Sequence, residues 1–227
     1  MGERHTVTVD GDDVVAVHHP AKTDRWFVCS HGFVSDKEGS YESRCERAVA
    51  EGYHGVRFDH RGCGESDRSF GEQTLETRVA DLRAVLSYFD PAECVLFGSS
   101  FGGFVALHAA VDDPRVVAVA VRAPVTDTSP FEAYRSSLTE EFQNALETYP
   151  FERIERGLSV PVAIFHGRTD ETVPLEDSLA AVGRLSTDAL VQVYAGEGHR
   201  FSRRAENRMC DQLFGWVNAV DGHATDR

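Results

Sequence analysis

Short apolar runs alternate with amphipathic stretches along most of this sequence, and the alternation limits the folds that the chain can adopt. From the third run onward they are nearly continuous in Val, Ile, Phe and Cys, as is typical of strands buried on both faces of a parallel sheet. Eight strands are predicted, at Thr6–Val9, Val14–His18, Trp26–Ser30, Gly55–Asp59, Cys94–Phe97, Val116–Val121, Val160–Phe165 and Val191–Tyr194. Strands that alternate with helices in this way favour a doubly wound α/β sheet with right-handed crossovers.

Apolar residues at three- and four-residue spacing between these runs predict helices. Three such stripes lie at residues 75–89, 175–185 and 209–217. The first two strands are joined by Asp10-Gly11-Asp12, a sequence typical of a hairpin turn. We therefore expect the sheet to begin with an antiparallel edge.

Residues 124–159 interrupt the alternation, because no strand is predicted there. One long helix is expected to follow Ser129, which has the character of an N-cap, and to end at Pro150. Its apolar stripe consists of Tyr134, Leu138, Phe142, Leu146 and Tyr149. The sequence thus predicts a single domain over residues 1–227 with a short helical lid or insertion.

The net charge of −14 restricts the partners that the protein can have. It disfavours nucleic acid and anionic membranes, which would both be repelled. Only Lys22 and Lys37 are lysines, and acidic proteins with little lysine resemble those of salt-loving archaea. We expect a small-molecule substrate and a stability that depends on salt; the oligomeric state is not predicted.

The five cysteines form no CxxC pair, so free thiols in a reducing compartment are expected. No apolar run is long enough to span a membrane, and the N-terminus lacks a secretory segment. A cytoplasmic location is therefore predicted. No cofactor or metal is expected, since the histidines are scattered and no His-Glu-x-x-His motif occurs.

A predicted strand runs directly into Gly98-Ser99-Ser100-Phe101-Gly102 and then into a helix. This Gly-x-Ser-x-Gly pattern is typical of a nucleophile held on a sharp strand-to-helix turn, where the residues two before and two after it must be small. Ser100 satisfies that condition, whereas Ser99 would be flanked by two phenylalanines. The turn also directs the helix N-terminus and the Phe101 N–H toward developing negative charge.

A serine nucleophile needs a base, and the base needs a carboxylate that orients it. His199 follows the last predicted strand and two glycines, whereas His223 lies in a polar tail. Asp170 is the first carboxylate after the strand Val160–Phe165; Glu171 and Asp177 are nearby alternatives. We predict a triad of Ser100, His199 and Asp170.

The order Ser100, Asp170, His199, each residue just past a strand, resembles the triad order of the α/β-hydrolase superfamily. Ser30-His31-Gly32-Phe33 is similar to the oxyanion loop of that family, which implies that the Phe33 N–H is a second oxyanion donor. The segment from Asp59 to Ser66 resembles the Asp-x-Arg-Gly-x-Gly-x-Ser motif of its serine aminopeptidase-like and monoglyceride-lipase-like branch. The resemblance implies an α/β-hydrolase fold with a mostly parallel eight-stranded sheet.

These residues predict a serine hydrolase that cleaves carboxylic esters through an acyl-enzyme on Ser100. The same machinery would also serve an amide, peptide or thioester hydrolase, and a catalytically inactive binding protein is a further alternative. Four aromatic residues are candidates to line a substrate pocket: Phe33, Phe131, Tyr134 and Phe142.

Overall fold

The computed structural model describes residues 2–128 and 139–224, which form an eight-stranded sheet in the order β1-β2-β4-β3-β5-β6-β7-β8. All neighbouring strands are parallel except β1 with β2 and β2 with β4, so the predicted antiparallel N-terminal edge is confirmed. The strands are β1 (Glu3–Val9), β2 (Asp12–His19), β3 (Arg25–Ser30), β4 (His54–Phe58), β5 (Glu93–Ser99), β6 (Val116–Arg122), β7 (Val162–Gly167) and β8 (Ala189–Tyr194).

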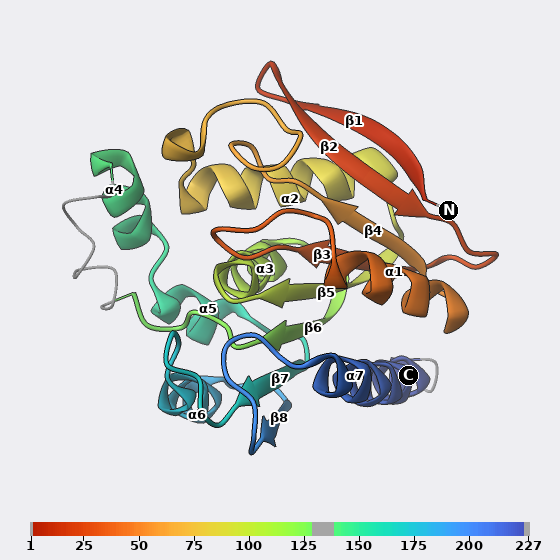
Figure 1. Cartoon of the computed structure of the whole chain (residues 1–227), viewed down its shortest axis with the longest axis vertical. Helices are drawn as coiled ribbons and strands as arrows, with labels where there is room; N and C mark the ends of the chain where they lie inside the picture. Colours follow the sequence, from red (N-terminus) through yellow and green to blue (C-terminus); the bar gives the residue numbers. More distant parts are fainter. Residues whose placement is uncertain (1, 129–138, 225–227) are drawn as a thin grey trace.

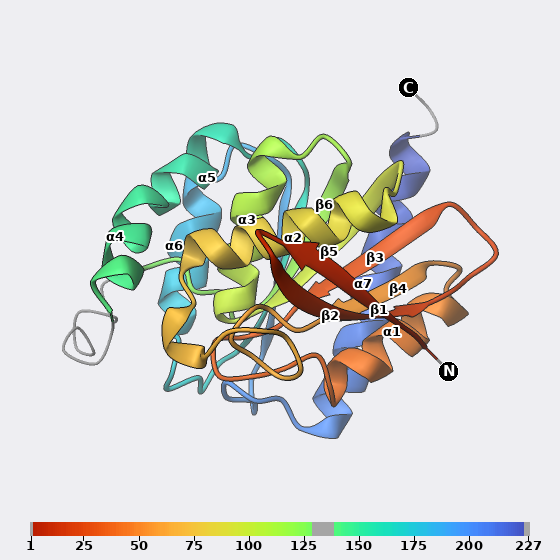
Figure 2. The ribbon, with the colours of Figure 1, turned by 90° about the horizontal axis from the view of Figure 1, so that it is seen from above.

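Helices cover both faces of the sheet (Figures 1 and 2). One face carries α1 (Ser40–Ala50) and α7 (Arg203–Ala224). The other face carries α2 (Leu75–Phe89), α3 (Phe101–Asp112) and α6 (Leu175–Arg184), with α4 (Glu140–Thr148) and α5 (Phe151–Gly157) packed outside α2 and α3. No described helix has the length and apolarity to cross a membrane.

The central strands are buried on both sides because their side chains alternate between two cores. In β3 and β5, Val28 and Leu96 belong to the core under α2 and α3, whereas Phe27 and Phe97 belong to the core under α1 and α7. This two-sided burial explains why these strands appear in the sequence as continuous apolar runs.

The prediction of one long helix between Ser129 and Pro150 is wrong. Thr139 has an extended backbone and caps α4, since its hydroxyl accepts a hydrogen bond from the N–H of Phe142 at 3.2 Å. A threonine side chain that bonds to the backbone in this way favours a helix start over a helix interior. Pro150 does end the helix, as predicted, but α5 follows it at once.

Candidate active site

Ser100 occupies the sharp turn between β5 and α3, with φ of 54° and ψ of −123°. A non-glycine residue rarely adopts a positive φ, and surrounding bonds must hold it there. The Ser100 N–H donates to the carbonyl of Arg122 at 2.8 Å, and its own carbonyl accepts from the N–H groups of Gly103 and Val125. The turn is thus fixed by the neighbouring strand β6.

The two glycines of the motif are required by close backbone packing. A Cβ on Gly98 would overlap the carbonyl of Gly102, and a Cβ on Gly102 would overlap the carbonyls of Ser30 and His31. No side chain fits at either position without moving backbone. The segment after β3, which is predicted to form the oxyanion loop, can therefore lie directly against the Ser100 turn.

Asp170 lies in the loop after β7 and His199 in the loop after β8, and their side chains contact each other at the carboxyl ends of these strands. The His199 Nδ1–H donates to Oδ2 of Asp170 at 2.8 Å, while Oδ1 of Asp170 accepts from the N–H groups of Thr172 and Val173 at 2.9 Å each. Neither Glu171 nor Asp177 is bonded to His199 in the described structure. The bond leaves the Nε2 of His199 with its lone pair.

Several hydrogen bonds keep Asp170 ionised although it is buried. Burial alone would raise the pKa of this carboxyl. The side chains of His166 and His199, together with the two backbone N–H groups, outweigh the burial and hold the pKa of Asp170 below its ordinary value. A permanent carboxylate beside His199 stabilises a positive charge on that ring.

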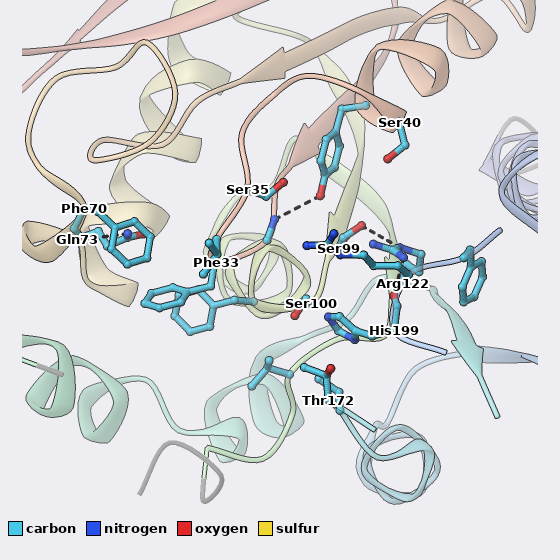
Figure 3. Close-up of a pocket in the computed structure, with 18 of the residues that line it drawn as sticks. Phe33, Ser35, Ser40, Phe70, Gln73, Ser99, Ser100, Arg122, Thr172 and His199 are labelled. Carbon is cyan, nitrogen blue, oxygen red and sulfur yellow. Dashed lines mark hydrogen bonds between the residues drawn. The ribbon is translucent and has the colours of Figure 1, made fainter. Parts of the chain in front are cut away.

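The ring of His199 points toward the Ser100 hydroxyl, and both residues line one cavity of about 1200 Å³ (Figure 3). The structure thus brings together the three residues predicted from sequence. The side chain of His223, the alternative histidine, lies outside the described residues.

The loops that carry Asp170 and His199 are fastened to each other and to the sheet. Thr169 donates to the carbonyl of Glu197 from both its N–H and its hydroxyl, at 3.0 Å each. A side chain at Gly167 would collide with the carbonyl of Glu197, so the close approach needs glycine there. Arg122 donates from Nη1 to the carbonyl of His199 at 2.7 Å, a contact that the sequence analysis did not predict.

Arg78 is a second residue beside the candidate site that the sequence did not predict. This fully buried guanidinium on α2 donates to the carbonyls of His31, Gly32 and Phe33 at 3.2, 3.2 and 2.9 Å. Burial lowers the pKa of Arg78 to about 10, so it stays charged at neutral pH. His31 itself braces the loop, since its Nδ1–H donates to the Gly32 carbonyl and its Nε2 accepts from the His60 N–H.

The Asp-x-Arg-Gly-x-Gly-x-Ser segment has a structural role. The buried Asp59 carboxylate accepts from the N–H and Nζ of Lys37 at 2.7 Å each, and from the N–H of Glu65 at 2.9 Å. Arg61 donates from its backbone N–H and Nε to Asp81. These bonds brace the loop beside the site.

The cavity has two chemically different sides (Figure 3). Phe33 and Phe70 lie on one side, where the Phe33 ring contacts the rings of Phe70, Phe101 and Phe142 at 5.0–5.4 Å between centroids. Ser40, Ser99 and Arg122 lie on the other side of Ser100. Of the four predicted pocket aromatics, Phe33 and Phe142 line the cavity, and Phe131 and Tyr134 lie outside the described residues.

Known proteins share both sequence and fold with this chain. It matches the family model described as Hydrolase_4, serine aminopeptidase S33, over residues 21–156, which is more than half of its length. It is 28% identical over 183 residues to the human palmitoyl-protein thioesterase ABHD10, mitochondrial. That alignment covers 68% of this chain and 60% of the human protein, so the chain spans less than two thirds of this relative.

Solved structures confirm the fold. Est1E from Butyrivibrio proteoclasticus, solved with ferulic acid bound, superposes with a TM-score of 0.85 at 19% identity, over 96% of this chain and 99% of that one. Mouse alpha/beta hydrolase domain-containing protein 10 superposes with a TM-score of 0.78 at 22% identity, over 98% and 99%. The α/β-hydrolase fold predicted from sequence is therefore present. The chain belongs to the serine aminopeptidase S33 family of hydrolases.

Proposed function

We propose that the protein is a serine hydrolase that cleaves carboxylic esters through an acyl-enzyme intermediate on Ser100. One observation carries the proposal: the Asp170–His199 hydrogen bond fixes the tautomer of a ring that points toward Ser100. A serine hydroxyl is a weak nucleophile until an oriented base takes its proton. The strained turn then presents an activated hydroxyl to the cavity.

In the acylation step, the Ser100 Oγ attacks the carbonyl carbon of the ester while His199 Nε2 takes the hydroxyl proton. The tetrahedral oxyanion is held by two backbone N–H groups. One is that of Phe33, in the loop after β3, and the other is that of Phe101, at the N-terminus of α3. The carbon–oxygen bond to the alcohol then breaks, and the imidazolium of His199 gives its proton to the departing alcohol. Asp170 stabilises the imidazolium throughout.

In the deacylation step, a water molecule takes the place that the alcohol has left and acts as the nucleophile. His199 Nε2 takes a proton from the water, whose oxygen attacks the acyl carbonyl carbon of the ester on Ser100. The same oxyanion site holds the second tetrahedral intermediate. Its collapse breaks the bond to Ser100 Oγ, which recovers its proton from His199, and releases the carboxylic acid.

The aromatic side of the cavity suits the acyl group. The rings of Phe33, Phe70, Phe101 and Phe142 offer an apolar surface beside Ser100, which favours an alkyl or aryl acyl chain. The leaving group would then lie toward the polar side that holds Ser40 and Arg122. The esterases among the similar structures are consistent with this substrate class.

A thioester is the second candidate substrate, because the human relative and its orangutan counterpart are named palmitoyl-protein thioesterases. A thiolate leaves without full protonation, so a thioesterase depends less on His199 as an acid. An amide or peptide bond needs that proton transfer most. Esters, thioesters and anilides with the same acyl chain would rank the three possibilities.

The proposal is tested by kcat/KM on p-nitrophenyl esters of increasing chain length, measured at several salt concentrations. Replacing Ser100 with Ala should lower kcat by at least about 10⁴-fold while the circular dichroism spectrum stays unchanged. Ser99→Ala is the matched control, because it removes the adjacent hydroxyl, with its 3.3 Å bond from Nε of Arg122, but no member of the proposed triad. Turnover retained in Ser100→Ala would contradict the assignment, and a folded wild type without turnover on any acyl substrate would favour a binding protein.

A further inference from the structure

Three potential metal ligands share one face of the β1–β2 hairpin. Glu3 lies directly opposite His18 in the antiparallel register, and His5 is two residues beyond Glu3 on the same strand. Alternate residues of a strand, together with their cross-strand partners, point to the same side of a sheet. Histidines that are scattered in the sequence are therefore neighbours in space.

The ligand atoms converge at distances close to those of a metal site. Oε2 of Glu3 lies 4.0 Å from Nε2 of His5 and 3.9 Å from Nδ1 of His18, and one ligand atom from each residue lies within 4.8 Å of the other two. Ligands of a tetrahedral zinc ion at 2.0–2.1 Å are about 3.4 Å apart. Movements of less than about 1 Å by each ligand atom would bring the three atoms to the separations of a zinc site.

A chain of hydrogen bonds turns the lone pair of His18 toward Glu3. The Nε2–H of His54 donates to the carbonyl of Thr23 at 2.7 Å, so Nδ1 of His54 is an acceptor. That atom accepts from the Ala21 N–H and, at 2.9 Å, from Nε2–H of His18. The Nδ1 of His18 is then unprotonated. Metal-binding histidines commonly donate their other ring N–H in this way.

His5 presents an unsatisfied nitrogen to the same point. Its Nδ1 lies 3.3 Å from the Tyr88 hydroxyl, while its Nε2 is buried and has no hydrogen-bond partner among the described residues. A buried polar atom without a partner is uncommon and indicates a missing ligand or water. When Nδ1–H donates to Tyr88, Nε2 carries a lone pair aimed at Glu3 and His18.

Aromatic rings hold the histidines in place. Trp26 stacks on His18 and His54, with 5.2 and 4.3 Å between ring centroids, and Phe89 packs edge-on against His5 at 5.1 Å. Glu3 is 63% exposed, so an ion can reach the cluster from solvent. Rings fixed by packing need little reordering when they bind a ligand.

We propose that Glu3, His5 and His18 bind a divalent transition-metal ion of the zinc class, with solvent completing its coordination. Two imidazoles and one carboxylate suit Zn²⁺ and disfavour the hard ions Mg²⁺ and Ca²⁺, which prefer oxygen ligands. Trp26 and His54 lie at the starts of β3 and β4, whereas Ser100 follows the end of β5. The proposed ion site therefore lies at the amino-terminal ends of the parallel strands, whereas Ser100 lies at their carboxyl ends. A bound ion would link β1 to β2, independently of the proposed hydrolase chemistry.

The test uses the full chain, freed of metal by a chelator and titrated with Zn²⁺ in a calorimeter and with Co²⁺ under visible spectroscopy. We expect one ion per chain and a ligand-field spectrum of Co²⁺ that Zn²⁺ abolishes. Zn²⁺ at a hundredfold excess over its Kd should raise Tm by about 5–10 °C.

Glu3→Gln, His5→Gln and His18→Gln should each weaken Zn²⁺ binding at least tenfold. His54→Gln should weaken it about 10–100-fold, because it removes the bond that orients His18 but none of the three proposed ligands. His19→Gln is the matched control, since its side chain lies on the other side of β2. All of these variants keep the five cysteines, so Zn²⁺ binding that persists in them can be assigned to thiols. His199→Ala keeps the proposed metal site, so Zn²⁺ binding that is lost in this variant can be assigned to the active-site histidine.

The proposal is overturned if the wild type binds no Zn²⁺ saturably, or if binding survives in His5→Gln and His18→Gln. Glu3→Gln guards against misfolding as an explanation, because Glu3 is largely exposed and its loss should leave the metal-free Tm unchanged. Binding that is lost in His199→Ala but retained in the hairpin variants would place the ion at the active site and contradict the proposal.

Discussion

Each oxygen of the Asp170 carboxylate has its own partners, and this division explains what the residue does. Oδ1 is bound by two backbone N–H groups, whereas Oδ2 is bound by His199 and lies 3.4 Å from Nε2 of His166. In Asp170→Asn the amide oxygen would keep the backbone bonds, so the amide NH₂ would face His199 and select the wrong tautomer. We expect kcat to fall about 10⁴-fold while KM changes little. Glu171→Gln, which changes the adjacent exposed carboxylate, should retain activity.

The same carboxylate contributes to stability in a pH-dependent way. Its pKa is lower in the folded protein than the ordinary value of 3.8, so its contribution is complete above that value and disappears as the pH falls through the folded pKa. The free energy of unfolding lost in Asp170→Asn should therefore be larger at pH 7 than at pH 3, as measured by urea denaturation. A loss that is equal at both pH values would contradict the lowered pKa.

Arg78 holds the proposed oxyanion loop through the carbonyls of residues 31–33. Arg78→Met would leave these buried acceptors without donors, at a cost of about 2–4 kcal/mol in the free energy of unfolding. A displaced Phe33 N–H should also lower kcat about 10²-fold in the molecules that remain folded. Arg83→Met on the same helix is the control. Unchanged kcat in folded Arg78→Met would reduce Arg78 to a purely structural residue.

The convergence of Ser100, His199 and Asp170 was predictable because each follows a strand within a local pattern of glycines or a helix-leading proline. Arg78 and Arg122 were not, because their partners are 45–47 and 77 residues away in the sequence. An arginine within the apolar face of 75–89 was the one available signal. It does not identify the carbonyls that the guanidinium binds.

Among the helices, α4 contacts the candidate site through the ring of Phe142, which packs against Phe33 and Phe101. Phe142 is buried and its ring lies 5.7 Å from Phe101 and 5.3 Å from Phe33. Phe142→Ala should reduce the free energy of unfolding by about 3 kcal/mol or more. It should also raise KM for long-chain esters about tenfold relative to short-chain esters. Asn144→Ala, exposed on the same helix, should change neither quantity; equal KM changes at all chain lengths would show that Phe142 does not contact the acyl chain.

The sequence pattern predicted all eight strands to within three residues at either end. The buried parallel strands are continuous apolar runs, and the turn at Asp10-Gly11-Asp12 separates the two antiparallel strands at the edge. It failed at Thr139, because an apolar stripe continues through a residue whose hydroxyl caps the next helix. The helices α1 and α5 were also not predicted. We propose that residues 124–159 act as a lid. The comparison of KM between long-chain and short-chain esters in Phe142→Ala tests whether α4 contacts the substrate.

At the scale of the whole molecule, the acidic surface is expected to make stability depend on salt. The chain carries 37 acidic against 23 basic residues, and counter-ions screen the resulting repulsion. We expect Tm to rise between low salt and molar KCl, although screening also weakens exposed ion pairs such as Arg184–Glu152. Equimolar sucrose controls for solute exclusion. A Tm that is independent of KCl would count against adaptation to a salt-rich cell.

Whether Ser100 is the nucleophile can be measured by covalent labelling of the folded wild type with a fluorophosphonate, followed by mass spectrometry of the labelled peptide. We expect one adduct per chain, on Ser100, that is absent in Ser100→Ala and forms far more slowly in His199→Ala. An unlabelled folded protein, or an adduct on Ser99 or any other residue, would contradict it.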